Sequence, residues 1–325
     1  MQYGQVPGVD KSVSRLVLGT MIINTRELES SFALLDSAFE QGYNTLDTAH
    51  VYAGGDSERA IGRWLKARGN REKVVIISKG AHPNADRWRV TPFDITADLT
   101  DSLARLQTDY IDIYLLHRDD PEVPVGPIVE VLNEHYEAGK IRAFGGSNWR
   151  HERIQAANDY AAAHNLQPFV ASSPNFSLAE QLDNPWGPGC VSISGPREAE
   201  AREWYRRGNM PIFAYSSLAR GLFSGRITRE NYHRTKEQLD KACRRAYCHE
   251  PNFERLERAR RLAEVKGVSV PQVALAYLFH HGLNVFALVG AASPAELADN
   301  LPALDIKLTA AELSWLDLTS DVSPI

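Results

Sequence analysis

Four side chains suited to proton transfer follow short apolar segments of the chain. Asp47 ends the segment NTLD, and Tyr52 lies five residues further on. Lys79 follows VVIIS, and His117 follows IDIYLL. A tyrosine hydroxyl has a pKa of about 10, which is too high for easy proton donation near neutrality. A buried lysine beside it would lower that pKa. The set therefore predicts a device that gives a proton to the oxygen of a carbonyl group undergoing reduction.

In this device Tyr52 is the general acid and Lys79 tunes its pKa, while Asp47 keeps Lys79 charged and oriented. His117 donates a hydrogen bond that polarises the carbonyl group. Each residue also has an ordinary structural interpretation. Asp47 could cap a helix and Tyr52 could be a packed aromatic, while Lys79 could be solvated and His117 could be a core histidine. Because all four interpretations would have to coincide at neighbouring segments, the sequence favours the catalytic set.

The segments that carry these residues belong to a repeating pattern of short β-branched runs and amphipathic stretches. Strands are expected at residues 15–18, 44–46, 74–78, 111–116, 143–145, 169–172, 211–214 and 285–289. Helices are expected between them, including residues 29–41, 57–67, 94–106, 127–138, 152–164 and 197–207. Such alternation implies a parallel sheet. Eight units predict a closed α/β (β/α)8 TIM barrel in a single domain, 1–325, whose strand ends converge on one mouth.

Two connections are too long to be simple turns. Residues 175–194 contain NPWGPG, and residues 221–251 are rich in charged and aromatic side chains. Long loops in a compact domain tend to be functional, and both follow expected strands, so we expect them at the C-terminal mouth of the barrel. Near the end of the chain, Thr309 and Glu312 have the spacing of a capping box and predict an extra C-terminal helix.

Composition excludes several classes of partner. The 325 residues carry a net charge of −5, which does not favour nucleic acid or an anionic membrane surface. No apolar run approaches the roughly 20 residues that span a bilayer, and the start lacks the pattern of a secretory signal. The cysteines, Cys190, Cys243 and Cys248, are odd in number and sparse, which favours a reducing, cytoplasmic location. The sequence leaves the oligomeric state open.

Two further groups of residues could suggest a binding site for a metal or for a dinucleotide. Cys243, Cys248 and His249 could suggest a metal, but no second ligand pair at zinc spacing accompanies them, so we expect no metal site. No glycine-rich fingerprint follows the first expected strand, and Gly54 and Gly55 precede a helix start. A nicotinamide cofactor would therefore bind here without a Rossmann unit.

The segments LDTAHVYAGGDSERAIGRWL, VVIISKG and DYIDIYLLHRDD resemble the aldo-keto reductase superfamily, with the motifs in the same order. The resemblance extends from VLGTM to Asn300. It implies the same tetrad of Asp47, Tyr52, Lys79 and His117. It also implies an NAD(P)(H)-dependent oxidoreductase that transfers a hydride between a nicotinamide and a carbonyl or alcohol, with the cofactor extended across the barrel mouth.

The resemblance also implies a set of cofactor-binding residues. Ser147 and Asn148 match the pair that holds the nicotinamide carboxamide, and Tyr215 matches the aromatic residue that stacks on the ring. Tyr215 could instead be a core residue and Asn148 a helix cap. The remaining matches follow the pyrophosphate and the adenosine: Ser216, Leu218, Arg220, Gly221, Gly290, Ser293 and Asn300.

Two departures from the family pattern affect the cofactor. Ser173 stands where a glutamine commonly contacts the carboxamide, and Glu296 stands where an arginine or glutamine is often found. A carboxylate would repel the 2′-phosphate of NADP but could accept a hydrogen bond from a free ribose hydroxyl. Ser293 could still donate to a phosphate. The choice between NADP and NAD therefore stays open.

The expected substrate-binding residues are Trp88, Arg118 and Trp149. Aromatic faces pack on C–H groups and charged groups bind hydroxyls, so this lining suits a sugar or polyol as the carbonyl or alcohol substrate. The alternative is that residues 118–120 form a solvated turn. Two rival functions are a cofactor-binding auxiliary subunit on the same fold and a metal-dependent barrel enzyme. The intact tetrad argues against the first, and Lys79 would be a poor neighbour for a metal cation.

Overall fold

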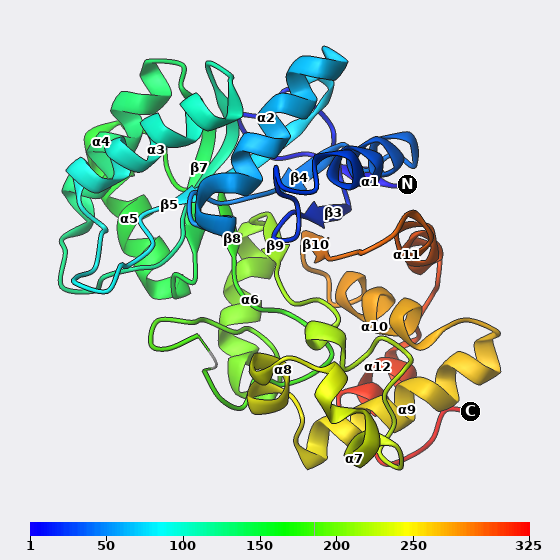
Figure 1. Ribbon diagram of the computed structural model, residues 1–325. Coiled ribbons are helices and arrows are strands. Elements are labelled where there is room, and N and C mark those ends of the chain that lie inside the picture. Colours follow the sequence, from blue (N-terminus) through cyan, green and yellow to red (C-terminus); the bar gives the residue numbers. More distant parts are fainter. Residues whose placement is uncertain (185) are drawn as a thin grey trace.

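The computed structural model describes residues 1–184 and 186–325. Within these residues, eight parallel strands close into a barrel in the order β10-β3-β4-β5-β6-β7-β8-β9, so the (β/α)8 prediction is confirmed (Figure 1). The strands are β3 (Leu16–Gly19), β4 (Thr45–Asp47), β5 (Val75–Gly80), β6 (Ile111–Leu116), β7 (Ile141–Ser147), β8 (Ala171–Ser173), β9 (Ile212–Ala214) and β10 (Val285–Val289). The six expected helices are also present: α1 (Leu28–Glu40), α2 (Asp56–Arg68), α3 (Pro92–Leu106), α4 (Val125–Glu137), α5 (His151–His164) and α6 (Ala199–Gly208).

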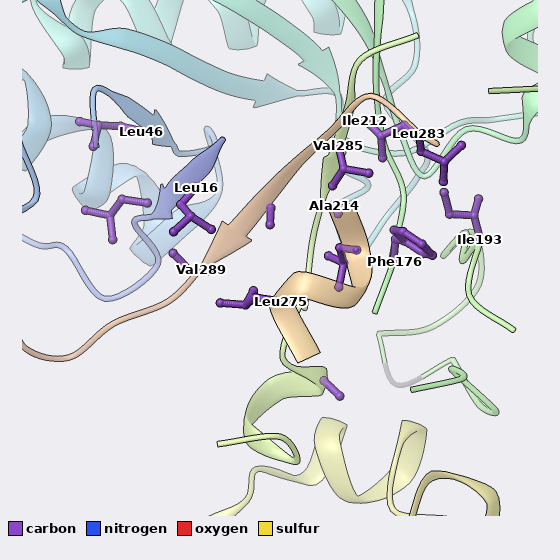
Figure 2. Packing of buried hydrophobic residues seen from close by; sticks show 14 of the residues in the cluster. Leu16, Leu46, Phe176, Ile193, Ile212, Ala214, Leu275, Leu283, Val285 and Val289 are labelled. Atoms are coloured by element: carbon purple, nitrogen blue, oxygen red, sulfur yellow. The ribbon is translucent and has the colours of Figure 1, made fainter. Parts of the chain in front are cut away.

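In most of the barrel strands, alternate residues belong to two different apolar clusters. In β5, Val75 and Ile77 lie in a cluster inside the barrel, whereas Ile76 lies in the cluster between the strands and the surrounding helices. This alternation is the period of two that a strand imposes on its side chains. Figure 2 shows the outer cluster along β10, where Leu275 of α10 (Val270–Phe279) lies beside the strand. Both faces of the strands are therefore buried, which explains their continuous apolar sequences.

The amino-terminal end of the barrel is closed by a short hairpin. Strands β1 (Tyr3–Gly4) and β2 (Val13–Ser14) pair antiparallel. Val6, Val9 and Val13, in and around the hairpin, join the inner cluster together with Phe213 and Phe286. The sequence pattern does not predict this hairpin, because strands of two residues carry no periodic signal.

The second half of the chain is more helical than expected. Three helices were not among those expected: α9 (Glu250–Lys266), α10 and α11 (Pro294–Asn300). Residues 221–251, expected as a loop, contain the short helices α7 (Tyr232–Thr235) and α8 (Lys241–Ala246). The predicted C-terminal helix is confirmed as α12 (Ala310–Leu316), with Thr309 and Glu312 forming its capping box. None of the helices in the described residues is long and apolar enough to cross a membrane.

Candidate active site

The four tetrad residues meet at the mouth of the barrel. Asp47 is the last residue of β4, Lys79 lies near the end of β5, and His117 directly follows β6. These three strands are neighbours in the barrel. Tyr52 begins a 3-10 turn that leads into α2, and the turn is made by residues 53–55, which all have positive φ. The turn directs the chain back so that the Tyr52 hydroxyl reaches Lys79.

Lys79 is the centre of the tetrad. Its Nζ donates to Asp47 Oδ2 at 2.7 Å, to the Tyr52 hydroxyl at 3.2 Å and to the Thr48 carbonyl at 3.0 Å. The side chains of Lys79 and Asp47 are only 3% and 2% exposed. Burial lowers the pKa of Lys79, but Asp47 and Tyr52 outweigh burial, so the pKa of Lys79 is raised. Lys79 therefore stays cationic around neutral pH.

The structure corrects the predicted pKa of Tyr52. Lys79 was expected to lower it below its usual value. Burial of the phenol instead raises the pKa of Tyr52, and the positive charges of Lys79 and Arg118 offset only part of that effect. Burial disfavours the charged phenolate more than nearby cations favour it. Tyr52 is accordingly protonated around neutral pH, as a proton donor must be, but its higher pKa also makes the phenol a weaker acid.

His117 is neutral and faces Tyr52. The two rings lie 5.8 Å apart in a perpendicular arrangement, and His82 packs edge-on against His117 at 4.9 Å. Burial moves the pKa of His117 well below its usual range, and the charges of Lys79 and Arg118 act in the same direction. A neutral imidazole has one N–H to donate. In this neutral form His117 has one N–H that can donate a hydrogen bond, and it lacks the extra proton of an imidazolium.

Several of the expected cofactor residues are brought together beside the tetrad. Ser147 Oγ and the Asn148 amide N–H both donate to the Ser173 carbonyl, at 3.1 Å in each case. Asn148 Nδ2 donates to the His117 carbonyl at 3.2 Å, and its Oδ1 accepts from the Tyr215 hydroxyl at 2.7 Å. The Ser173 hydroxyl is buried and finds no partner among the described residues. This free polar group at the end of β8 fits the amide of a nicotinamide.

The segment expected along the pyrophosphate has an unusual backbone. Ser216 and Arg220 both have φ of 53°, and Gly221 has φ of 99°. A non-glycine residue held in this region costs about 1–3 kcal/mol, and such residues cluster at ligand sites. The Gly221 amide N–H donates to the Leu218 carbonyl at 3.0 Å. Arg220 is ion-paired with Asp240 of the 221–251 segment, so a phosphate would have to compete with that carboxylate.

The residues expected near the adenosine lie around α11. Ser293 Oγ accepts from the Glu296 amide at 3.3 Å, and Glu296 Oε2 accepts from the Ala292 amide at 2.8 Å. Glu296 is exposed, and the space beside the Gly290 Cα is open. Asn300 is buried at the end of the same helix. Ser293 is thus the N-cap of the helix, and Glu296 ties down the residue before it while its charge stays exposed.

A cavity of about 350 Å³ is lined in part by His82, the residue that packs edge-on against His117 of the tetrad. Its lining includes His82, Trp88, Arg118 and Trp186. Arg118 is 7% exposed, so it does not belong to a solvated turn. Trp186 and His82 were not predicted as site residues, although the NPWGPG loop was expected at the mouth and His82 lies three residues beyond Lys79.

Trp149 does not line this cavity, which corrects its expected contact with substrate. Its side chain is fully buried and packs against Phe169 at a ring distance of 5.1 Å. Its indole Nε1 donates to the Arg118 carbonyl at 3.1 Å. Trp149 is thus a buried packing residue that holds the backbone of Arg118 in place.

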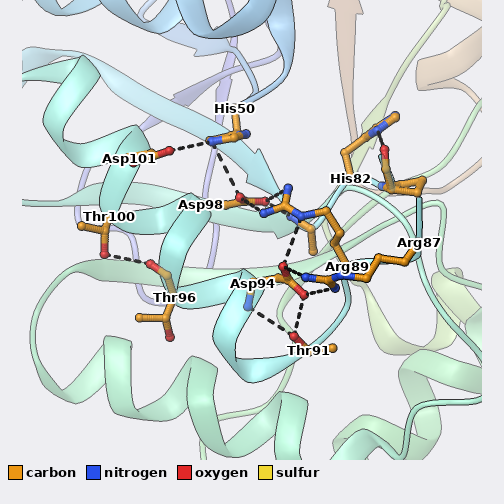
Figure 3. A network of polar contacts seen from close by, with 12 residues as sticks. His50, His82, Arg87, Arg89, Thr91, Asp94, Thr96, Asp98, Thr100 and Asp101 are labelled. Atoms are coloured by element: carbon orange, nitrogen blue, oxygen red, sulfur yellow. Dashed lines mark hydrogen bonds and ion pairs between the residues drawn. The ribbon is translucent and has the colours of Figure 1, made fainter. Parts of the chain in front are cut away.

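The segment that carries Arg87 and Trp88 of the cavity lining is held by ion pairs, which Figure 3 shows. Arg87 donates to both oxygens of Asp94 at 2.6 and 2.7 Å, and Arg89 donates to both oxygens of Asp98 at 2.6 and 3.1 Å. Both aspartates lie on α3. The segment that carries Trp88 is therefore tied to a helix of the barrel, as a preorganised binding surface requires.

Cys243, one of the residues that could have suggested a metal site, lies in the protein interior. Cys243 is buried, and its thiol donates to the Ala219 carbonyl at 3.2 Å. Over the part of the chain that the structure describes, no three His, Cys, Asp or Glu side chains are arranged to hold a metal ion. All the cysteines are free thiols.

The fold and the site together define a (β/α)8-barrel protein with a buried carboxylate–lysine–tyrosine set beside a neutral histidine at its mouth. Comparison with known proteins narrows this class. The model of the "Aldo/keto reductase family" matches residues 15–320. The chain therefore belongs to the aldo/keto reductase family, which implies NAD(P)H-dependent reduction of carbonyl compounds.

Individual relatives are similar over most of their length. Aldo-keto reductase YhdN of Bacillus subtilis is 29% identical, with 91% of this chain and 87% of the relative covered. Norsolorinic acid reductase B of Dothistroma septosporum is 27% identical, with 98% and 81% covered. Probable aryl-alcohol dehydrogenase AAD4 of Saccharomyces cerevisiae is 27% identical, with 89% and 87% covered. The crystal structure of the thermostable aldo-keto reductase Tm1743 with the inhibitor epalrestat matches with a TM-score of 0.75 at 25% identity, covering 98% of this chain and all of that one.

Proposed function

We propose that this protein transfers a hydride between a nicotinamide cofactor and a small carbonyl or alcohol substrate, with Tyr52 as general acid and base. The observation that carries the proposal is the buried contact of Lys79 Nζ with both Asp47 and the Tyr52 hydroxyl, at 2.7 and 3.2 Å. This arrangement holds one ionisable hydroxyl at a fixed place beside a cation, in a site from which water is largely excluded.

The protein residues have separate tasks in this reaction. A bound nicotinamide supplies the hydride in reduction and accepts it in oxidation. During reduction, Tyr52 gives its proton to the carbonyl oxygen, which becomes a hydroxyl, and Lys79 stabilises the phenolate that is left. His117 donates a hydrogen bond to the same oxygen and polarises the carbonyl group. Asp47 keeps Lys79 charged and in place.

The residues around the mouth support a cofactor lying across it. Ser147, Asn148, Ser173 and Tyr215 would hold the nicotinamide end. The phosphates would lie along the 216–221 segment, and the adenosine near Gly290, Ser293 and Asn300. The cofactor is NAD or NADP. The exposed carboxylate of Glu296 favours NAD, because it would repel a 2′-phosphate, whereas the Ser293 hydroxyl is a group that a phosphate could use.

The cavity supports a substrate with both apolar and polar parts. Trp88 and Trp186 provide aromatic faces and Arg118 a cation. This lining is compatible with the sugar or polyol expected from the sequence. It is equally compatible with an aromatic carbonyl compound, in keeping with the names of the aryl-alcohol dehydrogenase and norsolorinic acid reductase relatives. The free thiols support a reducing, cytoplasmic location for the reaction.

The direct test is a titration of the purified protein with NADH and, separately, NADPH, followed by quenching of tryptophan fluorescence. Trp186 is the reporter to expect, because its ring lies 5.9 Å from that of Tyr215. We expect saturable binding of at least one nucleotide and its oxidation when an aldehyde is added. Folded protein that binds neither nucleotide would refute the proposal.

A further inference from the structure

Arg118 is a buried cation in the cavity beside the tetrad. It is 7% exposed and directly follows His117 in the chain. Its Nη1 donates to the His117 carbonyl at 2.9 Å, and its Nη2 contacts the Cys190 sulfur at 3.6 Å. Burial raises the pKa of the Cys190 thiol, so this neighbour is neutral. No carboxylate of the described residues lies within ion-pair distance of Arg118.

The other buried cations of the described chain all have carboxylate partners. Lys79 is paired with Asp47. Arg258, 8% exposed, contacts Glu254 at 2.9 Å and Asp321 at 3.0 Å. Arg255 is 3% exposed and lies 4.0 Å from Glu180. Burying a charge without a partner is costly, so the exception at Arg118 calls for an anion from outside the chain.

The groups around the cavity leave the charge of Arg118 available. Arg87 also lines the cavity, but it is exposed and its guanidinium is bound by Asp94. Asp86 lies on the exposed part of the lining and is not an ion-pair partner of Arg118. Burial lowers the pKa of His82, so this ring is neutral around pH 7. The cavity thus combines one buried guanidinium with the aromatic faces of Trp88 and Trp186.

We propose that Arg118 binds a carboxylate of the substrate, so that the compound reduced or oxidised carries a carboxylate as well as its carbonyl or hydroxyl group. This inference rests on the proposed function of the tetrad. A guanidinium forms paired, charge-assisted hydrogen bonds with a carboxylate. His82 lines the cavity with Arg118 and packs on His117, which in turn faces Tyr52. A substrate that extends from the cavity past His82 would therefore bring its carboxylate to Arg118 and its carbonyl oxygen to Tyr52. Sugar acids and aromatic carboxy-aldehydes both meet this description.

The test compares matched substrates that differ in one charge. We would measure kcat/KM for para-carboxybenzaldehyde and for methyl para-formylbenzoate, and in a second pair for glucuronate and glucose. We expect the carboxylate in each pair that is turned over to be preferred by about 10- to 100-fold, the range of a hydrogen bond to a charged group. The preference should reside in KM more than in kcat, because the carboxylate stays bound throughout the reaction.

Variants assign the preference to Arg118. Arg118→Met should reduce it to near unity, and Arg118→Lys should retain part of it because the charge remains. Arg150→Met is the matched control: Arg150 also lies beyond the end of a barrel strand, but it is exposed, is paired with Glu152 and lies outside the cavity lining. This control should keep the full preference.

Some outcomes would overturn the proposal. One is a wild-type protein that turns over the ester as well as the acid. Another is an Arg118→Met variant that loses activity equally on both, which would assign Arg118 to the proton-transfer step. If Arg118→Met does not fold, inhibition of the wild-type protein decides: benzoate should compete with substrate more strongly than benzamide, and equal inhibition would overturn the proposal. Absence of turnover for all substrates, charged and neutral, with both nucleotides would instead refute the proposed function.

Discussion

The two ends of the barrel differ in how their charged groups are paired. At the amino-terminal end, Lys11 Nζ donates to the Val74 carbonyl and Asp112 Oδ1, both at 2.8 Å. The second oxygen of Asp112 accepts from the Ile76 amide at 2.9 Å. These charges form a closed pair between the hairpin loop, which carries Lys11, and β6, which carries Asp112.

At the mouth, by contrast, polar groups lack protein partners. Among the described residues, Asp47 Oδ1, His117 Nδ1 and the Ser173 hydroxyl have no hydrogen-bond partner. No carboxylate of the described residues forms an ion pair with Arg118. An isolated buried polar group of this kind costs about 1–3 kcal/mol. The comparison indicates that the closed end stabilises the fold, while the open end keeps unmet binding capacity for small molecules. Changes at the two ends should therefore separate stability from activity.

The largest separation is expected from Tyr52→Phe. The substitution removes the transferable proton while keeping the ring, so kcat should fall by about 10²- to 10⁴-fold, the usual contribution of general acid catalysis. Nucleotide binding and the thermal midpoint should change little. Steady-state kinetics and a thermal melt measure both effects. Full activity in this variant would show that Tyr52 is not the acid.

Phe286→Ala should do the opposite at the closed end. Phe286 is fully buried and stacks on Phe213 at 5.0 Å. Its loss should lower the free energy of unfolding by about 3–5 kcal/mol, with KM nearly unchanged in the folded protein. Denaturant titration gives the first value, and Phe286→Leu, which keeps most of the volume, should lose much less. A large rise in KM for Phe286→Ala would break the proposed division between the ends.

Acid should weaken the fold through a histidine outside the mouth. His281 precedes β10, and burial lowers its pKa to about 4 from 6.5. The folded state therefore binds this proton less tightly than the unfolded state, and stability present above pH 6.5 is lost as the pH falls toward 4. The loss attributable to His281 is at most about 3 kcal/mol. Unfolding of His281→Gln should depend less on pH over this window, and an unchanged slope would exclude His281 as a source.

The buried arginines should differ in their effect on stability. Arg258 donates to two carboxylates and to the Trp315 and Ser320 carbonyls, so Arg258→Met should destabilise the protein by about 1–3 kcal/mol. Arg118→Met removes a buried cation that has no carboxylate partner and should be neutral or stabilising by about 1 kcal/mol. Chemical denaturation compares the two. If Arg118→Met destabilised the protein as much as Arg258→Met, groups within the protein would have to stabilise the charge of Arg118.

The smallest effect is expected from Glu296→Gln. Gln keeps an oxygen that can accept from the Ala292 amide but removes the negative charge. The ratio of the dissociation constants for NADPH and NADH should shift toward NADPH by about 0.5 kcal/mol, the size of a surface charge interaction. Paired nucleotide titrations measure it, and the shift should shrink at high salt. A ratio that does not move would remove Glu296 from the cofactor site.

Sequence patterns predicted the features that depend on local order. The strands around Asp47 and Lys79 could be identified because runs such as VVIIS are buried on both faces, and strand order then brings their ends together. The hairpin of β1 and β2 could not be identified from the sequence, because its strands have only two residues each. The capping box at Thr309 could be predicted because its hydrogen bonds join residues only three positions apart.

Features that depend on three-dimensional surroundings were less predictable. Trp149 was assigned to the substrate site, but the turn after β7 directs its indole against Phe169. The net pKa of Tyr52 depends on how deeply the phenol is buried, and spacing carries no information about that. Likewise, the missing partner of Arg118 became visible only once the positions of all carboxylates around it were known.

The pairing of β10 with β3 has a consequence for synthesis on the ribosome. One edge of β3 pairs only with residues 287–289 of β10, which are synthesised long after β3. Until that last strand emerges, the nascent sheet has two open edges, which favour association with other chains. Ring closure therefore comes late, and a nascent chain stalled before β10 would be expected to depend on chaperones that shield those edges.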